Sequence, residues 1–214
     1  MKSITRQKPF DEIKEQLANL DRPFIIGCGT CTTMTKTGGI DQVLEMKNRL
    51  QELGTRISGW TVIPTACDEM TEVAMKENGA SLQSAGCILA MTCALGVHRM
   101  SLYIDRPVIP ALDTLFIGVE DTPGYFHEVC AQCGQCVLDE TAGICPITAC
   151  HKGLVNGPCG GTNNGKCEVD KEKDCAWTLI YERLKEQGRL DLMRKYHPPK
   201  NFQVAPRPRI VKIW

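Results

Sequence analysis

The number and spacing of the cysteines constrain this chain more than any other feature. Thirteen of the 214 residues are cysteine, and eight of these lie between Cys130 and Cys175. An odd number cannot pair completely within one chain. The first ten residues also lack the apolar stretch that begins a secretory signal. Dense cysteine in such a chain favours metal binding over disulfide formation, so we expect a cytoplasmic protein with metal-ligating thiolates.

The overall composition excludes several classes of partner. The 25 Lys and Arg balance the 25 Asp and Glu, which gives a formal net charge of zero. This balance offers no bulk electrostatic reason to expect nucleic acid or a membrane surface as a partner. The longest apolar-rich run, residues 87–97, is far shorter than the ~20 residues that cross a bilayer. We therefore expect a soluble protein without a membrane span.

Apolar periodicity in the first half of the chain predicts an α/β fold. Helical spacing predicts helices over residues 10–20, 41–53 and 70–78. Short apolar runs predict strands over residues 23–28, 56–63 and 87–91, a weaker edge strand over 107–112 and a further strand over 116–119. Alternating strands and helices are typical of a parallel sheet. Residues 1–124 are thus predicted to form a small, flavodoxin-like α/β domain that carries an N-terminal cluster site.

The second half of the chain differs from the first in composition and periodicity. Residues 125–176 are rich in Gly and Cys and lack periodicity, which predicts a ferredoxin-like metal-binding module that folds around its metal. Residues 176–187 form a predicted amphipathic helix, and the last predicted segment, 177–214, consists of this helix and an extended tail. The apolar end of the tail, Ile213 and Trp214, is expected to dock either on a partner or on its own domain.

The first cysteine group follows the ends of the predicted strands. Cys28 and Cys31 come at the end of the first strand, Cys67 follows the second and Cys93 follows the third. The carboxyl ends of parallel strands meet at one edge, so these four thiolates are predicted to hold a cubane cluster, whose irons each take one thiolate. Cys87 lies about five residues, or ~16 Å, from that edge and is assigned to the core. The competing choice, Cys87 as ligand in place of Cys67, stays open.

The remaining eight cysteines include a strong cluster motif. Cys130, Cys133 and Cys136 have the C-x-x-C-x-x-C spacing of bacterial ferredoxins, whereas zinc sites are usually built from separated C-x-x-C pairs. Spacing alone does not fix which cysteines share a centre. The predicted division assigns Cys130, Cys133, Cys136 and Cys175 to a second cluster, and Cys145, Cys150, Cys159 and Cys167 to a third cluster or a zinc ion.

Motifs for bond chemistry are missing from the sequence. It contains no G-x-G-x-x-G, no phosphate-binding G-x-x-x-x-G-K-[ST] and no C-x-x-x-C-x-x-C. We therefore predict no catalytic residues in this chain, and a role in carrying electrons.

Several cysteine-rich segments together resemble one family. The segments are residues 130–136, 143–146, 156–161, 165–168 and 174–177. They look like the C-terminal module of methylenetetrahydrofolate reductase-associated proteins. With the Cys28–Cys31 motif added, nearly the whole chain resembles the small, MetV-type iron–sulfur subunit of the reductase of acetogenic bacteria.

The resemblance implies a division of labour between two subunits. In that family a (β/α)-barrel large subunit carries FMN or FAD and reduces 5,10-methylenetetrahydrofolate to 5-methyltetrahydrofolate in the Wood–Ljungdahl pathway of one-carbon metabolism. The small subunit would hold two to three [4Fe-4S] clusters and deliver electrons to that flavin from a donor that the sequence does not identify. The family's module has also been described as zinc-binding, so zinc at one site stays open.

Two other functions fit the same cysteines. One is a structural zinc-binding subunit that stabilises or tethers a catalytic partner. The other is a thiol oxidoreductase that uses Cys28 and Cys31 as a reversible redox pair.

Overall fold

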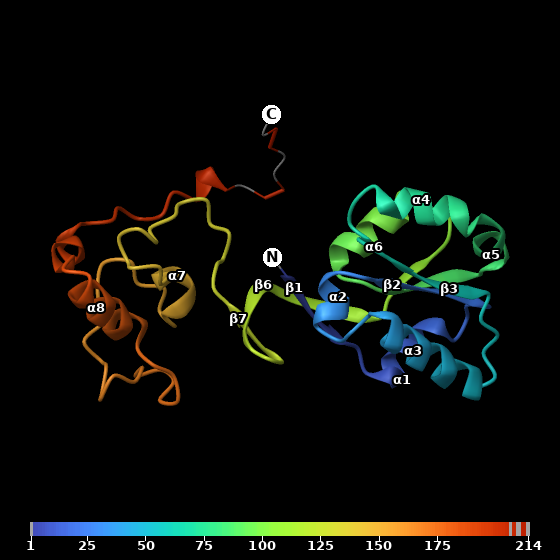
Figure 1. The fold of residues 1–214 in the computed structure, drawn as a ribbon, viewed down its shortest axis with the longest axis horizontal. Coiled ribbons are helices and arrows are strands. Elements are labelled where there is room, and N and C mark those ends of the chain that lie inside the picture. The colour runs from blue at the N-terminus through green and yellow to red at the C-terminus, as the bar shows by residue number, and fades with distance from the viewer. Residues whose placement is uncertain (1, 206, 209–210, 213–214) are drawn as a thin grey trace. The chain divides into compact units, whose positions relative to one another are not determined.

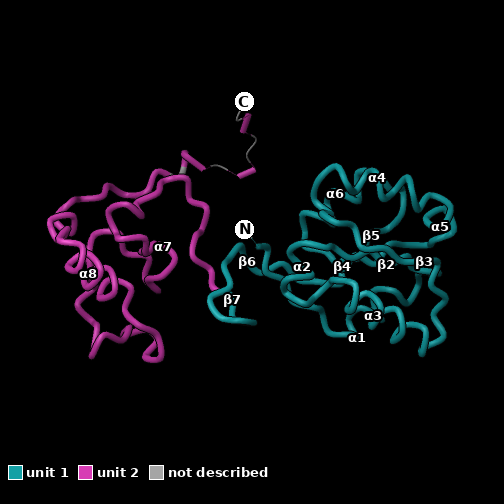
Figure 2. Tube along the Cα trace, viewed as in Figure 1, with its two compact units in different colours: residues 1–126 teal, residues 127–214 magenta. Residues whose placement is uncertain are grey.

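The computed structural model describes residues 2–205, 207–208 and 211–212. The chain forms two compact units, residues 1–126 and 127–214 (Figure 2). Within the described residues, no helix is long and apolar enough to cross a membrane. The predicted docking of Ile213 and Trp214 lies outside the described residues.

A parallel sheet forms the centre of the first unit. Its strands are β2 (Pro23–Cys28), β3 (Gly59–Ile63), β4 (Cys87–Met91) and β5 (Val108–Pro110), in the order β3-β2-β4-β5 with every pairing parallel. This arrangement confirms the predicted α/β fold. β5 lies at the edge, as expected for a strand that contains a proline, because proline has no N–H to donate to a further neighbour.

Helices cover both faces of this sheet (Figure 1). The helices α1 (Phe10–Leu17) and α3 (Ile40–Glu52) pack against one face, where Ile25 of β2 is buried. On the other face, α4 (Met70–Glu77), α5 (Gly79–Ser84) and α6 (Ala94–Ser101) cover Phe24 and Ile26. Successive residues of a strand point to opposite faces, so a continuous apolar run in β2 fills both halves of the core.

An antiparallel sheet, which the sequence did not predict, completes the first unit. It contains β1 (Lys2–Gln7), β6 (Leu112–Thr122) and β7 (Tyr125–Glu128), in the order β1-β6-β7. The predicted strand over residues 116–119 is the middle of β6. β1 has a single apolar side chain, Ile4, and its partner lies more than one hundred residues away, where Ile4 pairs with Phe116. Its strand character therefore comes from tertiary pairing and not from a local pattern.

The second unit has little regular structure. It contains α7 (Pro146–Ala149), α8 (Ala176–Glu186) and two 3-10 turns, η1 (Leu190–Arg194) and η2 (Phe202–Val204). Among the described residues its buried core consists of Ala142, Trp177, Ile180 and Leu184. α8 supplies three of these four, so the predicted amphipathic helix is confirmed and packs within the cysteine-rich unit. A core this small favours additional cross-links such as metal ions.

Candidate metal centres

The four N-terminal cysteines lie where the parallel strands end. β2 ends at Cys28, and the short helix α2 (Cys31–Met34) begins three residues later. Cys67 lies in the loop after β3, and Cys93 is the N-cap residue of α6. Ligands of open parallel sheets gather at this edge, so the structure places all four residues in the region where a bound group is expected.

The loops that carry these four thiols pack against one another. A Cβ at Gly29 would lie 3.0 Å from the carbonyl oxygen of Pro64, and a Cβ at Gly96 would lie 3.1 Å from the Cβ of Ala66. Partial burial raises the pKa of the Cys67 thiol, and the nearby Cys93, Cys28, Asp68 and Cys31 raise that pKa further. The structure therefore brings together the predicted first group. Its role as a ligand set stays a prediction.

The four thiols differ in their access to solvent. Cys28 and Cys93 are buried, Cys31 is half-buried and Cys67 is exposed. A group held by all four would have its inner side against the sheet and its outer side at the surface of the unit. Such a position combines a low-dielectric environment with access from solvent.

Cys87 has a different environment. It is fully buried at the start of β4, where it pairs with Pro23, at the opposite end of the sheet from Cys28. It packs among the apolar residues of the α1–α3 face, and burial raises the pKa of its thiol to about 11. A thiol with such a pKa stays protonated near neutral pH, and the thiolate is the form that binds metal. The structure thus places Cys87 in the core.

A tight loop holds Cys28 and Cys31 in place. The hydroxyl of Thr32 donates to the carbonyl of Cys28 (3.1 Å) and lies 3.3 Å from the carbonyl of Met91. The N–H of Cys28 in turn donates to the carbonyl of Gly38 (3.0 Å). A Cβ at Gly38 would overlap the carbonyl oxygen of Met91, so only glycine fits there. The loop is therefore anchored to the ends of both β2 and β4.

β1, a strand of the antiparallel sheet, forms hydrogen bonds with this loop. The hydroxyl of Thr5 lies 2.6 Å from that of Thr37 and 3.2 Å from that of Thr35, and Gln7 donates to the carbonyl of Thr37 (2.9 Å). The sequence did not indicate these contacts, because they depend on the long-range pairing of β1 with β6.

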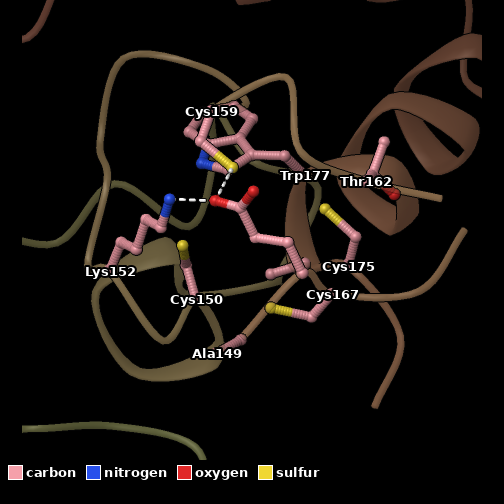
Figure 3. Close-up of a pocket in the computed structure, with 10 residues that line it drawn as sticks. Ala149, Cys150, Lys152, Cys159, Thr162, Cys167, Cys175 and Trp177 are labelled. Atoms are coloured by element: carbon pink, nitrogen blue, oxygen red, sulfur yellow. Dashed lines mark hydrogen bonds and ion pairs between the residues drawn. The ribbon is translucent and has the colours of Figure 1, made fainter. Parts of the chain in front are cut away.

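In the second unit, four cysteines line one pocket. They are Cys150, Cys159, Cys167 and Cys175, and they share the pocket with Lys152, Thr162, Glu168 and Trp177 (Figure 3). The Cys159 thiol donates to a carboxylate oxygen of Glu168 (3.4 Å), and Lys152 forms an ion pair with the same oxygen. The hydrogen bond with Glu168 raises the pKa of Lys152, and the one with Lys152 lowers the pKa of Glu168.

Cys175 is positioned by the start of α8. Burial raises the pKa of its thiol, but hydrogen bonds from Thr178, Trp177 and Thr162 together outweigh burial, so the pKa is lowered. As N-cap residue, Cys175 lies at the positive end of the helix dipole, where a thiolate is stabilised. Both effects favour the thiolate form of Cys175, which is the form that binds metal.

The triplet of Cys130, Cys133 and Cys136 lies in a separate loop. A backbone hydrogen bond at Gln135 and the ammonium group of Lys200 lower the pKa of Cys133. The tail contacts the same loop, since the N–H of Asn201 donates to the side chain of Gln135 (3.1 Å). The tail around Asn201 therefore packs on its own unit.

The structure does not group Cys145 with the pocket cysteines. Cys145 is the N-cap residue of α7, whereas Cys150 is its C-cap residue, and the Thr148 hydroxyl lies 3.6 Å from the Cys145 sulfur. The division predicted from the sequence groups Cys145 with Cys150, and Cys175 with the triplet. That division stays a prediction, and the pocket supports a different one.

The donor atoms of both neighbourhoods suit a metal–thiolate group, but the described side chains are not arranged around a metal ion. Within the part of the chain described, no three His, Cys, Asp or Glu side chains are arranged to hold one metal ion. A single zinc ion draws four sulfurs to about 2.3 Å, whereas a cubane takes one thiolate per iron and spreads them around a larger group. Sets made only of thiolates are typical of zinc and iron–sulfur centres, so the donor chemistry of both neighbourhoods fits such groups.

Comparison with known proteins gives one similarity. Residues 109–203 match a family model described as methylene-tetrahydrofolate reductase C terminal. The match covers less than half of the chain, and it includes all eight cysteines between Cys130 and Cys175 but none of the N-terminal four. It supports a relationship of this region to methylenetetrahydrofolate reductases. No curated protein and no solved structure matches the chain.

Proposed function

We propose that this chain is an iron–sulfur electron-transfer subunit that relays electrons to the flavin of a methylenetetrahydrofolate reductase partner. The observation that carries the proposal is the gathering of Cys28, Cys31, Cys67 and Cys93 at the carboxyl edge of the parallel sheet. A set of four thiols suits a cubane, which takes one thiolate on each iron. The family similarity over residues 109–203 supports the identity of the partner.

The chain's own residues would hold and tune the clusters. The anchored loop around Thr32 and Gly38 fixes two of the N-terminal thiols, and Cys67 leaves one side of the site open to solvent. The bound clusters would supply the one-electron chemistry. Reduction of 5,10-methylenetetrahydrofolate to 5-methyltetrahydrofolate would take place on the partner's FMN or FAD, since the sequence of this chain shows no nucleotide-binding fingerprint.

A structural zinc site in the second unit is the alternative. The small core around Trp177 and Ile180 favours it, because a segment with so few buried side chains gains much of its folding free energy from metal. In that case the second unit would tether or stabilise the catalytic partner and would not carry electrons.

Metal analysis after anaerobic purification tests the proposal. We expect a brown protein that bleaches with a strong reductant and contains about eight to twelve irons, or about four for each of two to three clusters. Stoichiometric zinc with negligible iron would contradict it. A colourless, metal-free protein with a reversible disulfide between Cys28 and Cys31 would support the thiol oxidoreductase instead.

A further inference from the structure

We infer that the second unit divides its eight cysteines in the order of the sequence, with the first four in one centre and the last four in the other. In this division the pocket thiols form one metal centre, and Cys145 completes the other centre with the triplet. The first set is Cys150, Cys159, Cys167 and Cys175, and the second is Cys130, Cys133, Cys136 and Cys145. The inference rests on the proposed function only in requiring that these thiols bind metal, whether iron or zinc.

Backbone hydrogen bonds bring Cys167 and Cys175 together. The N–H of Cys167 donates to the carbonyl of Lys173 (2.9 Å), and the N–H of Cys175 donates to the carbonyl of Gly165 (2.7 Å). These two bonds close the intervening residues into a short loop with both cysteines at its base. Their proximity is therefore fixed by the backbone and does not depend on the rotation of either side chain.

Cys150 joins them through the core of the unit. Both Cys150 and Cys175 pack against the buried cluster that contains Trp177 and Ile180. The indole N–H of Trp177 donates to the carbonyl of Leu154 (2.9 Å), which ties the segment after Cys150 to α8. Two cysteines that are 25 residues apart in sequence thus share one wall of the pocket.

Cys159 completes the pocket and is held by polar contacts. Its thiol donates to Glu168 (3.4 Å), and the N–H of Gly161 lies 3.4 Å from its sulfur. A Cβ at Gly161 would overlap the Glu168 carboxylate, which would have to move away from Cys159. Lys152, paired with Glu168, places a positive charge beside a centre that four thiolates would make negative.

The helix α7 separates Cys145 from this pocket. Cys145 and Cys150 cap opposite ends of a four-residue helix, which is about 6 Å long at 1.5 Å per residue. Cys145 is also linked to the triplet by a compact turn, in which the N–H of Gly143 donates to the carbonyl of Leu138 (2.8 Å). This turn lets the chain reverse shortly after Cys136. Cys145 is therefore assigned to the triplet, because it is the next cysteine in the chain and is not among the residues that line the pocket.

Pairs of substitutions distinguish the two divisions by counting metal. Full-length Cys159→Ala, Cys175→Ala and Cys145→Ala variants are purified anaerobically, and iron and zinc are measured by mass spectrometry. Each single variant should lose one centre, equal to about four irons or one zinc. The C159A/C175A double variant should lose no more than either single variant, whereas C145A/C159A should lose two centres. The reverse pattern would overturn the inference.

A second measurement covers variants that fail to fold. The unsubstituted protein is titrated with a chelator, and the thiols released at each step are alkylated and identified by mass spectrometry. Cys150, Cys159, Cys167 and Cys175 should become labelled in one step. Labelling of Cys145 together with Cys150 would overturn the inference, as would a second unit without metal. Both measurements count zinc and iron alike. The division of the cysteines can therefore be confirmed even if the metal is zinc and the electron-transfer proposal is wrong.

Discussion

Gly38 lies directly against the carbonyl of Met91, and a Cβ at Gly38 would overlap that oxygen. The contact joins the loop that carries Cys28 and Cys31 to the end of β4, from which the chain continues to Cys93. The geometry of the N-terminal thiol site thus depends on a glycine that is not itself a ligand.

We therefore expect Gly38→Ala to destabilise the first unit and to weaken its metal site. Overpacking against backbone typically costs about 1–3 kcal/mol, and the loop would have to move away from β4. The free energy of unfolding is measured by denaturant titration, and metal content is measured in parallel. Gly79→Ala is the control, since no described atom lies within 4 Å of a Cβ there, and its unfolding free energy should change little. Equal effects of the two substitutions would contradict this account of Gly38.

Cys67→Ser and Cys87→Ser should have opposite effects. Cys67→Ser removes a thiol from the group at the sheet edge, so one centre's metal should be lost with little change in the fold. Cys87→Ser should keep that metal but destabilise the protein by about 1–3 kcal/mol, because a hydroxyl is then buried among apolar residues. Metal counts and unfolding curves of both variants test this. Loss of metal in the Cys87 variant alone would show that Cys87 is the ligand.

The buried Cys87 thiol should also make stability depend on pH. Its pKa rises from 9.0 to about 11 on folding, so the folded state holds this proton more tightly. The stabilisation that this proton gives the folded state is complete below about pH 9 and is lost as the pH rises to about 11. Its full size is roughly 2–3 kcal/mol at 1.36 kcal/mol per pKa unit. We expect the difference in unfolding free energy between the protein and Cys87→Ala to shrink over this range, and a difference independent of pH would contradict the expectation.

Thr5→Val should weaken the contact between β1 and the loop that contains Thr37. The substitution removes the hydroxyl that lies 2.6 Å from Thr37, and we expect a loss of about 1 kcal/mol. Arg6→Ala on the same strand is the matched control, since its ion pair with Asp113 is long (3.9 Å) and exposed. Denaturant unfolding of both variants tests whether this contact of β1 stabilises the protein. A larger effect at Arg6 than at Thr5 would argue against it.

The sequence predicted those elements that have a pattern of their own. The apolar runs of β2 and β4 and the periodic faces of α1, α3 and α8 can be recognised without tertiary information. β1 could not be predicted, because Ile4 is its only apolar residue and its partner is distant. α6, which follows Cys93, was also missed, since its eight residues include a glycine and show only a short apolar face.

The same limit applies to the cysteines. The N-terminal group could be predicted because a general rule places strand ends at one edge. The grouping of Cys175 with Cys150 could not, because it depends on loop closure at Gly165 and on packing against Trp177. Spacing groups cysteines that are adjacent in sequence, and the fold groups those that are adjacent in space.

Electron paramagnetic resonance of the anaerobically purified, chemically reduced protein tests the central claim most directly. Reduced [4Fe-4S] clusters are paramagnetic, whereas zinc–thiolate centres are silent and carry no electrons. The account predicts cluster signals that integrate to at least two spins per chain, with one signal lost in Cys67→Ser. A silent spectrum from a protein that contains stoichiometric zinc would contradict it.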